Sequence, residues 1–260
     1  MTKVIILSAG QGRRLCPMTA ERPKCMLPIQ GKPLIEWQLE ALEACGIEHV
    51  TVVTGFGAEQ VEDLLVNRKG TAMTSVCFNP FFEAADNLIS CWAARGEMTG
   101  DFILLNGDTL FEPAVLERLM DSPARPVTLA TDVKSAYDAD DMKVQLADER
   151  LLQIGKNLPL DRTDGESIGL MLFRGQGVEL FRASLEQAVR DSRALKQWYL
   201  SIIGQIAESG QVWTQSIAGL DWSEIDYPLD LLRASAMVGR WHLSDAEQTA
   251  EGVADLMLSA

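Results

Sequence analysis

Short apolar runs alternate with amphipathic stretches over the first 125 residues of the chain. Four runs rich in β-branched or large apolar residues end at Ser, Gly or Asn, and we expect them to be strands, the first and the last of them buried: Val4–Leu7, Val50–Thr54, Thr74–Phe78 and Phe102–Leu105. Apolar residues at helical spacing predict helices over 33–45, 58–66, 86–95 and 112–120, with Pro33 opening the first and Asp86 or Asn87 capping the third. This alternation predicts parallel strands joined by right-handed crossovers.

The loops after these four strands carry most of the candidate chemistry. They span residues 8–14, 54–57, 79–87 and 106–109. Ligands of open α/β sheets bind beyond the carboxyl ends of the strands. We therefore expect the four loops to meet at one edge of the sheet.

The second half of the chain has a different pattern, with several strands joined by short turns. We expect strands over 127–132, 142–147, 151–154, 168–173 and 212–217, and helices over 176–190, 196–209 and 226–237. No Gly/Ser/Pro-rich linker separates the halves, so we predict one α/β domain over 1–236 with halves 1–125 and 126–236. Residues 237–260 form a helical tail, with a helix over 245–258 capped by Ser244.

The composition is that of a globular protein with a strong acidic excess. The formal net charge of −14 argues against nucleic acid or an anionic membrane surface as a partner. No apolar run reaches the roughly 20 residues of a membrane helix, and the start is too short and polar for a signal peptide. Five cysteines without a C-x-x-C motif favour the reducing cytoplasm over a zinc site or a disulfide framework.

One segment reverses this charge balance. Residues 1–32 contain six Lys and Arg but a single Glu, and the first strand runs directly into Gly10, Gly12 and Arg14. Small residues after a strand let backbone N–H groups approach an anion closely. The pattern lacks the Lys-Ser/Thr of a P-loop, and Leu15 stands at the third glycine of the dinucleotide fingerprint, which argues against a dehydrogenase. The alternative is a surface turn with scattered basic residues.

Together with Pro23-Lys24, this loop resembles the signature G-x-G-x-R-[LM]…P-K of the nucleotidyltransferases that act on sugar phosphates and phosphocholine. The matching residues are Gly10, Gly12, Arg14, Leu15, Pro23 and Lys24. The resemblance continues through Gly31–Ile35, Asn106–Asp108 and Trp222–Asp226. It implies the nucleotidyltransferase fold, a Rossmann-like, mostly parallel mixed sheet flanked by helices. It also implies transfer of a nucleotidyl group from a nucleoside triphosphate with release of pyrophosphate.

The resemblance assigns roles to the charged residues. Arg14 and Lys24 would hold the triphosphate as catalytic cations, and Asp108 and Asp226 would hold Mg²⁺, which takes one or two carboxylates and completes its shell with phosphate and water. The alternative is that Asp108 caps a turn and Asp226 caps the following helix. His49 and His242 are the only histidines, and we expect both to be structural. An ionised phosphate acceptor needs no general base.

The nucleotide is expected in the first half of the chain. Its predicted contacts are Leu7, Ala9, Gly10, Gly12, Asn87 and Ser90. The stretch 79–90 resembles the N-P…N-[LI]-x-S segment of phosphocholine cytidylyltransferase-like enzymes, whereas the Gln-x-x-x-x-Gly-x-x-x-Ala pattern of sugar-1-phosphate enzymes is absent. This favours CTP as the donor; the alternative for 79–90 is a plain loop with a capped helix.

The acceptor is expected in the second half. The predicted contacts are Tyr137, Lys156, Glu166 and Trp198; further candidates are Asp138, Asp140, Asp141, Lys143, Tyr199, Trp222 and Tyr227. Aromatic faces and carboxylates are suited to an ammonium group. The alternatives are a hydrated acidic loop over 137–141, core aromatic residues, and a surface role for Lys156.

We therefore predict a Mg²⁺-dependent nucleotidyltransferase that moves CMP from CTP to a small phosphorylated or phosphonylated, phosphocholine-like acceptor. A sugar-1-phosphate nucleotidylyltransferase and a catalytically silent nucleotide-binding regulatory protein are the alternatives. We expect no nucleic-acid or membrane partner, a cytoplasmic location, and pairing into a homodimer as one use of the tail.

Overall fold

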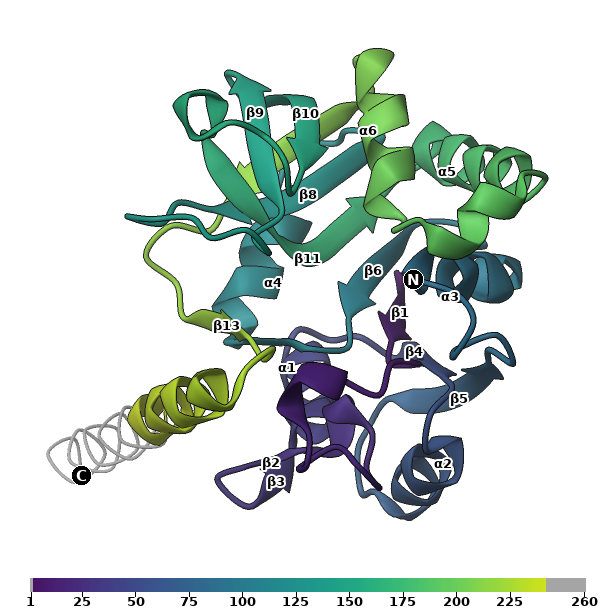
Figure 1. Cartoon of the computed structure of the whole chain (residues 1–260), viewed down its shortest axis with the longest axis vertical. Coiled ribbons are helices and arrows are strands. Elements are labelled where there is room, and N and C mark those ends of the chain that lie inside the picture. Colours follow the sequence, from purple (N-terminus) through teal and green to yellow (C-terminus); the bar gives the residue numbers. More distant parts are fainter. Residues whose placement is uncertain (1, 242–260) are drawn as a thin grey trace, which may run out of the picture.

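A mixed sheet of nine strands forms the centre of the computed structural model, which describes residues 2–241 (Figure 1). The strand order is β5-β4-β1-β6-β11-β8-β12-β10-β9. The strands are β1 (Lys3–Leu7), β4 (His49–Thr54), β5 (Met73–Phe78), β6 (Phe102–Asn106), β8 (Val127–Asp132), β9 (Lys143–Ala147), β10 (Arg150–Gly155), β11 (Gly165–Phe173) and β12 (Val212–Ser216). The first four strands of this sheet in chain order, β1, β4, β5 and β6, run parallel, while β11 is antiparallel to β6 and β8. The predicted mixed α/β sheet is confirmed, but it is not mostly parallel, because β11 is antiparallel to β6 and β8, and β10 is antiparallel to β9 and β12.

Helices cover both faces of the sheet. They are α1 (Leu34–Ala44), α2 (Ala58–Asn67), α3 (Asn87–Ala93), α4 (Pro113–Met120), α5 (Gln176–Ala188) and α6 (Leu200–Glu208). Alternate residues of β1 point to opposite faces, so Val4 and Ile6 pack with α1, α2 and α4 while Ile5 packs with α3, α5 and α6. Strands β1, β4 and β6 are therefore buried on both sides, whereas β5, at the edge of the sheet, is largely exposed.

The loops at the carboxyl ends of the parallel strands meet as predicted. The N–H of Gly107 donates to the carbonyl of Leu7 at 3.0 Å, and that of Phe56 donates to the carbonyl of Ala9 at 3.0 Å. The N–H of Asn79 donates to the carbonyl of Thr54 at 2.8 Å. Segments from four different crossovers thus share one edge of the sheet.

The long loop predicted over 9–32 contains more structure than its sequence suggested. It holds two 3₁₀ turns, Arg13–Leu15 and Lys24–Met26, and a short hairpin of β2 (Pro28–Ile29) with β3 (Lys32–Pro33). Contrary to the prediction, Pro33 is not the first residue of α1 but precedes it: its ψ of 144° is extended, and the helix begins at Leu34.

A second small ribbon was not predicted. Strands β7 (Thr109–Phe111) and β13 (Trp222–Glu224) pair antiparallel although they lie more than a hundred residues apart in the chain. Each has only three residues, too few for a hydrophobic period to be recognised.

The last part of the chain also differs from expectation. The helix predicted over 196–209 is a 3₁₀ turn at Ser192–Lys196 followed by α6. The helix predicted over 226–237 begins at 228 and continues to 241, through the position where we placed the tail (Figure 1). It packs with the β2–β3 hairpin and Trp37 through Ala234, Met237 and Val238. Ser244, the helix predicted over 245–258 and His242 lie outside the described residues.

Candidate active site

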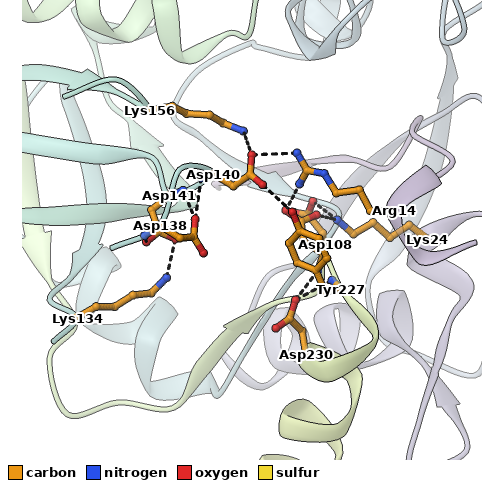
Figure 2. Close-up of polar contacts among 11 residues, drawn as sticks. Arg14, Lys24, Asp108, Lys134, Asp138, Asp140, Asp141, Lys156, Tyr227 and Asp230 are labelled. Carbon is orange, nitrogen blue, oxygen red and sulfur yellow. Dashed lines mark hydrogen bonds and ion pairs between the residues drawn. The ribbon is translucent and has the colours of Figure 1, made fainter. Parts of the chain in front are cut away.

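Four charged side chains, two cations and two carboxylates, converge at the carboxyl edge of the sheet (Figure 2). The Lys24 ammonium donates to Asp108 Oδ2 at 2.8 Å and also contacts Asp226 Oδ1. The Arg14 guanidinium donates to Asp226 Oδ2 at 2.8 Å. The structure therefore brings together the four side chains that the sequence assigned to one polyphosphate site.

The β7–β13 ribbon explains how the two carboxylates meet. Asp108 lies between β6 and β7, and Asp226 follows β13. Glu224 pairs with Thr109 across the ribbon, and the N–H of Ile225 donates to the carbonyl of Asp108 at 3.0 Å. Both carboxylates accept hydrogen bonds from cations, and not from the backbone N–H groups that a capping residue would bind. The N–H of Asp226 donates to Asp230, so Asp230 and not Asp226 binds the backbone before the following helix.

A glycine brings Lys24 close to the loop after β1. Gly12 has a φ of +75°, which only glycine adopts readily, and a Cβ built on it would lie 2.9 Å from the Cβ of Lys24. The Thr19 hydroxyl also donates to the Gly12 carbonyl at 2.8 Å and fixes the loop. Gly12 thus has a packing role beneath Lys24.

A third carboxylate, Glu224, belongs to the same cluster. Carboxylate oxygens of Asp108, Glu224 and Asp226 lie within 4.8 Å of one another. The sequence analysis left Glu224 without a role, although its spacing of two residues from Asp226 was a signal, since residues i and i+2 of an extended segment share a face.

The three carboxylates fit a divalent cation. Asp108 Oδ1 is buried and has no hydrogen-bond partner in the described part of the chain. A buried, unpartnered carboxylate oxygen is costly unless a cation or donor satisfies it. Oxygen ligands with a high negative charge are the set that Mg²⁺ prefers.

The pKa values reflect this crowding of charge. Burial lowers the pKa of Lys24, but Asp108 and Asp226 outweigh it and hold that pKa above its ordinary value. The pKa of Glu224 rises to about 8, first because protein atoms displace water around it and then because Asp108 and Asp226 repel its ionised form. Glu224 is nevertheless an exposed residue, so its carboxylate lies in an open cleft and not in a closed interior. A cation bound there would reverse this shift.

A cavity of about 460 Å³ opens beside Asp108 and contains most of the predicted nucleotide contacts. Among its lining residues are Leu7, Ala9, Gly10, Asn87, Ser90, Asn106 and Trp198. Gly12 is not part of the lining.

The Ser90 hydroxyl accepts from the Asn79 amide at 3.0 Å. Asp86 occupies the N-cap position of α3 without a capping side-chain bond, and Asn87 Oδ1 accepts from the N–H of Tyr199 at 3.0 Å instead.

A second cavity, of about 320 Å³, lies on the other side of the cluster. Its lining is acidic and aromatic: Asp132, Lys134, Asp138, Asp140, Asp141, Trp222, Ser223, Glu224, Asp226, Tyr227, Asp230 and Arg233. The two cavities share the acidic cluster, because Asp108 lines the first and Asp226 the second.

None of the four predicted acceptor residues is among the residues that line this second cavity, and Trp198 lines the first one instead. Lys156 donates to Asp140 Oδ1 at 3.2 Å and lies 4.4 Å from the ring centre of Trp198. Glu166 is buried behind the cavity and pairs with Lys134 at 2.8 Å. The Tyr137 hydroxyl accepts from the N–H of Lys134, and the residue lines neither cavity.

Two of the further candidates have structural roles. Tyr199 is fully buried and its hydroxyl donates to Asn106 Oδ1 at 3.0 Å. Lys143 is also buried and donates to main-chain carbonyls, that of Lys156 at 3.0 Å among them. Neither side chain is available to an acceptor in this conformation.

The fold and this site define a nucleotidyltransferase. The chain belongs to the MobA-like NTP transferase domain family, whose profile matches residues 4–196. The resemblance drawn from the sequence is confirmed.

The relatives include enzymes named for cytidylyl products. The chain is 30% identical over 242 residues to CMP-5'-(3-aminopropyl)phosphonate synthase of Streptomyces rubellomurinus, covering 89% of this chain but only 38% of that protein. It is 26% identical to CTP:phosphoglutamine cytidylyltransferase of Campylobacter jejuni, covering 87% of this chain and 96% of the relative. The inositol-1-phosphate CTP transferase of T. maritima superposes with a TM-score of 0.77 at 21% identity, over 92% of this chain and 96% of the other, and shows the shared fold. Within residues 2–241, no helix is both long and apolar enough to cross a bilayer.

Proposed function

We propose that the protein transfers CMP from CTP to a small acceptor that carries a phosphate or phosphonate group. The observation that carries this proposal is the contact of Arg14 and Lys24 with Asp108 and Asp226 at the mouth of the nucleotide-side cavity. The names of the two relatives support CTP as the donor.

In the proposed reaction, an oxygen of the acceptor's phosphate or phosphonate attacks the α-phosphorus of CTP. A new P–O bond forms there, the bond to the oxygen that bridges the α- and β-phosphorus breaks, and pyrophosphate leaves with that oxygen and its electron pair. Asp108 and Asp226, with Glu224 beside them, would hold Mg²⁺, which offsets phosphate charge when bound. Arg14 and Lys24 would stabilise the negative charge that builds up on the α-phosphate and on the departing pyrophosphate.

The nucleotide would occupy the first cavity. Leu7, Ala9 and Gly10 offer backbone groups after β1, with Gly12 shaping the turn behind them; Asn87 and Ser90 face the same cavity from α3. This chemistry needs no general base, because a phosphate or phosphonate is already ionised at neutral pH.

The acceptor would occupy the second cavity. Lys156, which reaches the cavity wall through Asp140, would contact its phosphate end together with Trp198, and Glu166 and Tyr137 would shape the wall through Lys134. The excess of carboxylates and the rings of Trp222 and Tyr227 support an acceptor with an ammonium group, as in phosphocholine.

A screen of pyrophosphate release tests the proposal. CTP, UTP, GTP, ATP and dTTP are each combined with phosphocholine, phosphoethanolamine, 2-aminoethylphosphonate, inositol 1-phosphate and glucose 1-phosphate, with and without Mg²⁺. We expect release with CTP, Mg²⁺ and an amine-bearing acceptor. Turnover only with another triphosphate and the hexose phosphate would show that the protein is a sugar-1-phosphate nucleotidylyltransferase instead.

Location and assembly are further parts of the proposal. All five cysteines are free thiols, which supports the cytoplasm. We also propose a homodimer, which light scattering of the purified chain would test.

A further inference from the structure

The carboxylate of Asp140 lies between two cations that come from opposite sides of the cleft (Figure 2). Its Oδ1 accepts from the Arg14 guanidinium at 3.0 Å and from the Lys156 ammonium at 3.2 Å. Its Oδ2 accepts from the Tyr227 hydroxyl at 2.8 Å. One anionic group therefore satisfies three donors, from the loop after β1, the segment after β10 and the segment after β13.

The two cations have a second support that does not depend on Asp140. The Arg14 guanidinium lies 5.5 Å from the ring centre of Tyr227, and the Lys156 ammonium lies 4.4 Å from that of Trp198. Cations over aromatic faces are held electrostatically by the ring. Arg14 is also anchored by Asp226. Arg14 and Lys156 can therefore keep their positions when a different anion lies between them.

The Asp140 carboxylate is thus surrounded by two cations and a hydroxyl group, and proteins bind phosphoryl groups with donors of these kinds. The position of this set supports such a ligand. Trp198 lines the nucleotide-side cavity, whereas Asp140 and Tyr227 line the acidic cavity. An anion held here lies between the two cavities and next to Asp226, where the reacting phosphates have to meet.

We propose that Arg14 and Lys156 form a subsite for a phosphoryl or phosphonyl dianion, and that Asp140 occupies this subsite as an internal counter-ion until the ligand displaces it. This inference rests on the proposed function, because the dianion is the acceptor's phosphate or phosphonate group. Asp140 lies on the loop over 133–142 between β8 and β9, with about a third of its side chain exposed, so its carboxylate can turn toward solvent. A ligand must outcompete one carboxylate charge, and the subsite therefore selects doubly charged groups over singly charged ones.

Calorimetric titration of the full chain with inorganic phosphate tests this subsite without turnover. Asp140→Asn keeps the side-chain shape but removes its charge, and we expect it to bind phosphate about tenfold more tightly than the wild type. Adding Lys156→Gln to Asp140→Asn should abolish the gain. Asp161→Asn, which removes an exposed carboxylate from the turn Leu160–Arg162, is the matched control and should bind like the wild type.

An unchanged or weaker phosphate affinity in Asp140→Asn would overturn the inference and make Asp140 a residue that only orients Arg14. Repeating the titration with saturating CTP distinguishes the two sources of phosphate. We expect phosphate still to bind, whereas loss of binding would assign the subsite to the triphosphate rather than the acceptor. If no triphosphate supports pyrophosphate release, the proposed function fails, yet phosphate binding still decides the role of Asp140.

Discussion

The ammonium group of Lys24 donates a hydrogen bond to Asp108 Oδ2 at 2.8 Å, although the two residues are 84 positions apart in the chain. The Lys24 side chain is 12% exposed, so this charge is largely removed from solvent. Because the same ammonium group contacts Asp226, one cation is shared by two carboxylates. A triphosphate brought to this edge meets a fixed positive charge that needs no rearrangement to act.

Replacing Lys24 with Met should lower turnover sharply with little change in shape. The loss of one positioned charge commonly costs on the order of 10²–10³ in kcat, because charge develops in the transition state. Steady-state pyrophosphate release with the best donor and acceptor from the screen measures this. Lys32→Met is the matched control, since Lys32 belongs to the same basic segment but pairs with Glu40 in α1. Equal turnover of Lys24→Met and the wild type would contradict the role of Lys24.

Local signals carried most of the success of the sequence-based predictions. Arg14 and Lys24 lie in one short motif, and Asp108 directly follows a buried apolar strand, so simple sheet topology placed them at one edge. Period and length were also sufficient for β1, β4, β6 and α4. These features depend on residues that are close together in the sequence, so a single sequence is enough to predict them.

Features built from distant pairings were not predictable in the same way. The β7–β13 ribbon joins segments more than a hundred residues apart, and neither strand has a period of its own. Tyr199 was a candidate ligand contact because an aromatic residue looks the same in sequence whether it is buried or exposed. Its burial follows from the packing of α3 and α6, which composition does not encode.

Removal of divalent metal should abolish turnover and leave the fold intact. Asp108 Oδ1 has no other partner in the described chain, so a cation bound by Asp108 and Asp226 would satisfy it. A chelator should stop pyrophosphate release, and Mg²⁺ should restore it. Asp108→Asn should raise the Mg²⁺ concentration for half-maximal rate by at least about tenfold, because one ligand charge is lost. Asp161→Asn is the control for an unrelated carboxylate, and an unchanged Mg²⁺ requirement in Asp108→Asn would rule out this ligand set.

Gly169→Ala should destabilise the protein more than other glycine substitutions at positive φ. Gly169 has a φ of +76°, and an added Cβ would lie 2.4 Å from the Asn106 amide nitrogen. Asn106 lines the nucleotide-side cavity and accepts from the buried Tyr199 hydroxyl, so displacing it should also raise the KM for CTP. Backbone strain of about 1–2 kcal/mol adds to overpacking of about 1–3 kcal/mol.

Gly31→Ala separates these two effects. Gly31 has a φ of +81° with nothing within 4 Å of an added Cβ, so only the strain applies there. Urea unfolding of both variants measures the free energies. A cost in Gly169→Ala no greater than that in Gly31→Ala would show that Asn106 moves aside freely.

The buried carboxyl of Glu166 should make the free energy of unfolding depend on pH. Burial raises its pKa to about 7 from an ordinary 4.5, with Lys134 only partly offsetting that cost. Between these two values the folded chain binds more protons than the unfolded chain, so stability falls as the pH rises. The contribution is fully present below pH 4.5 and is lost above pH 7.

Glu166→Gln removes this titration and keeps the side-chain volume. We expect the stability of the wild type relative to the variant to fall by up to about 3 kcal/mol between pH 4.5 and 8, at about 1.4 kcal/mol per pKa unit. Glu224 titrates in both proteins and cancels from the difference apart from its weak repulsion by Glu166. The pKa of Lys134 is raised and that of Asp141 is lowered, so both titrate outside the interval. Urea unfolding at several pH values measures the difference. A difference that stays constant over this range would mean that Glu166 is ionised throughout, and that Lys134 compensates fully for its burial.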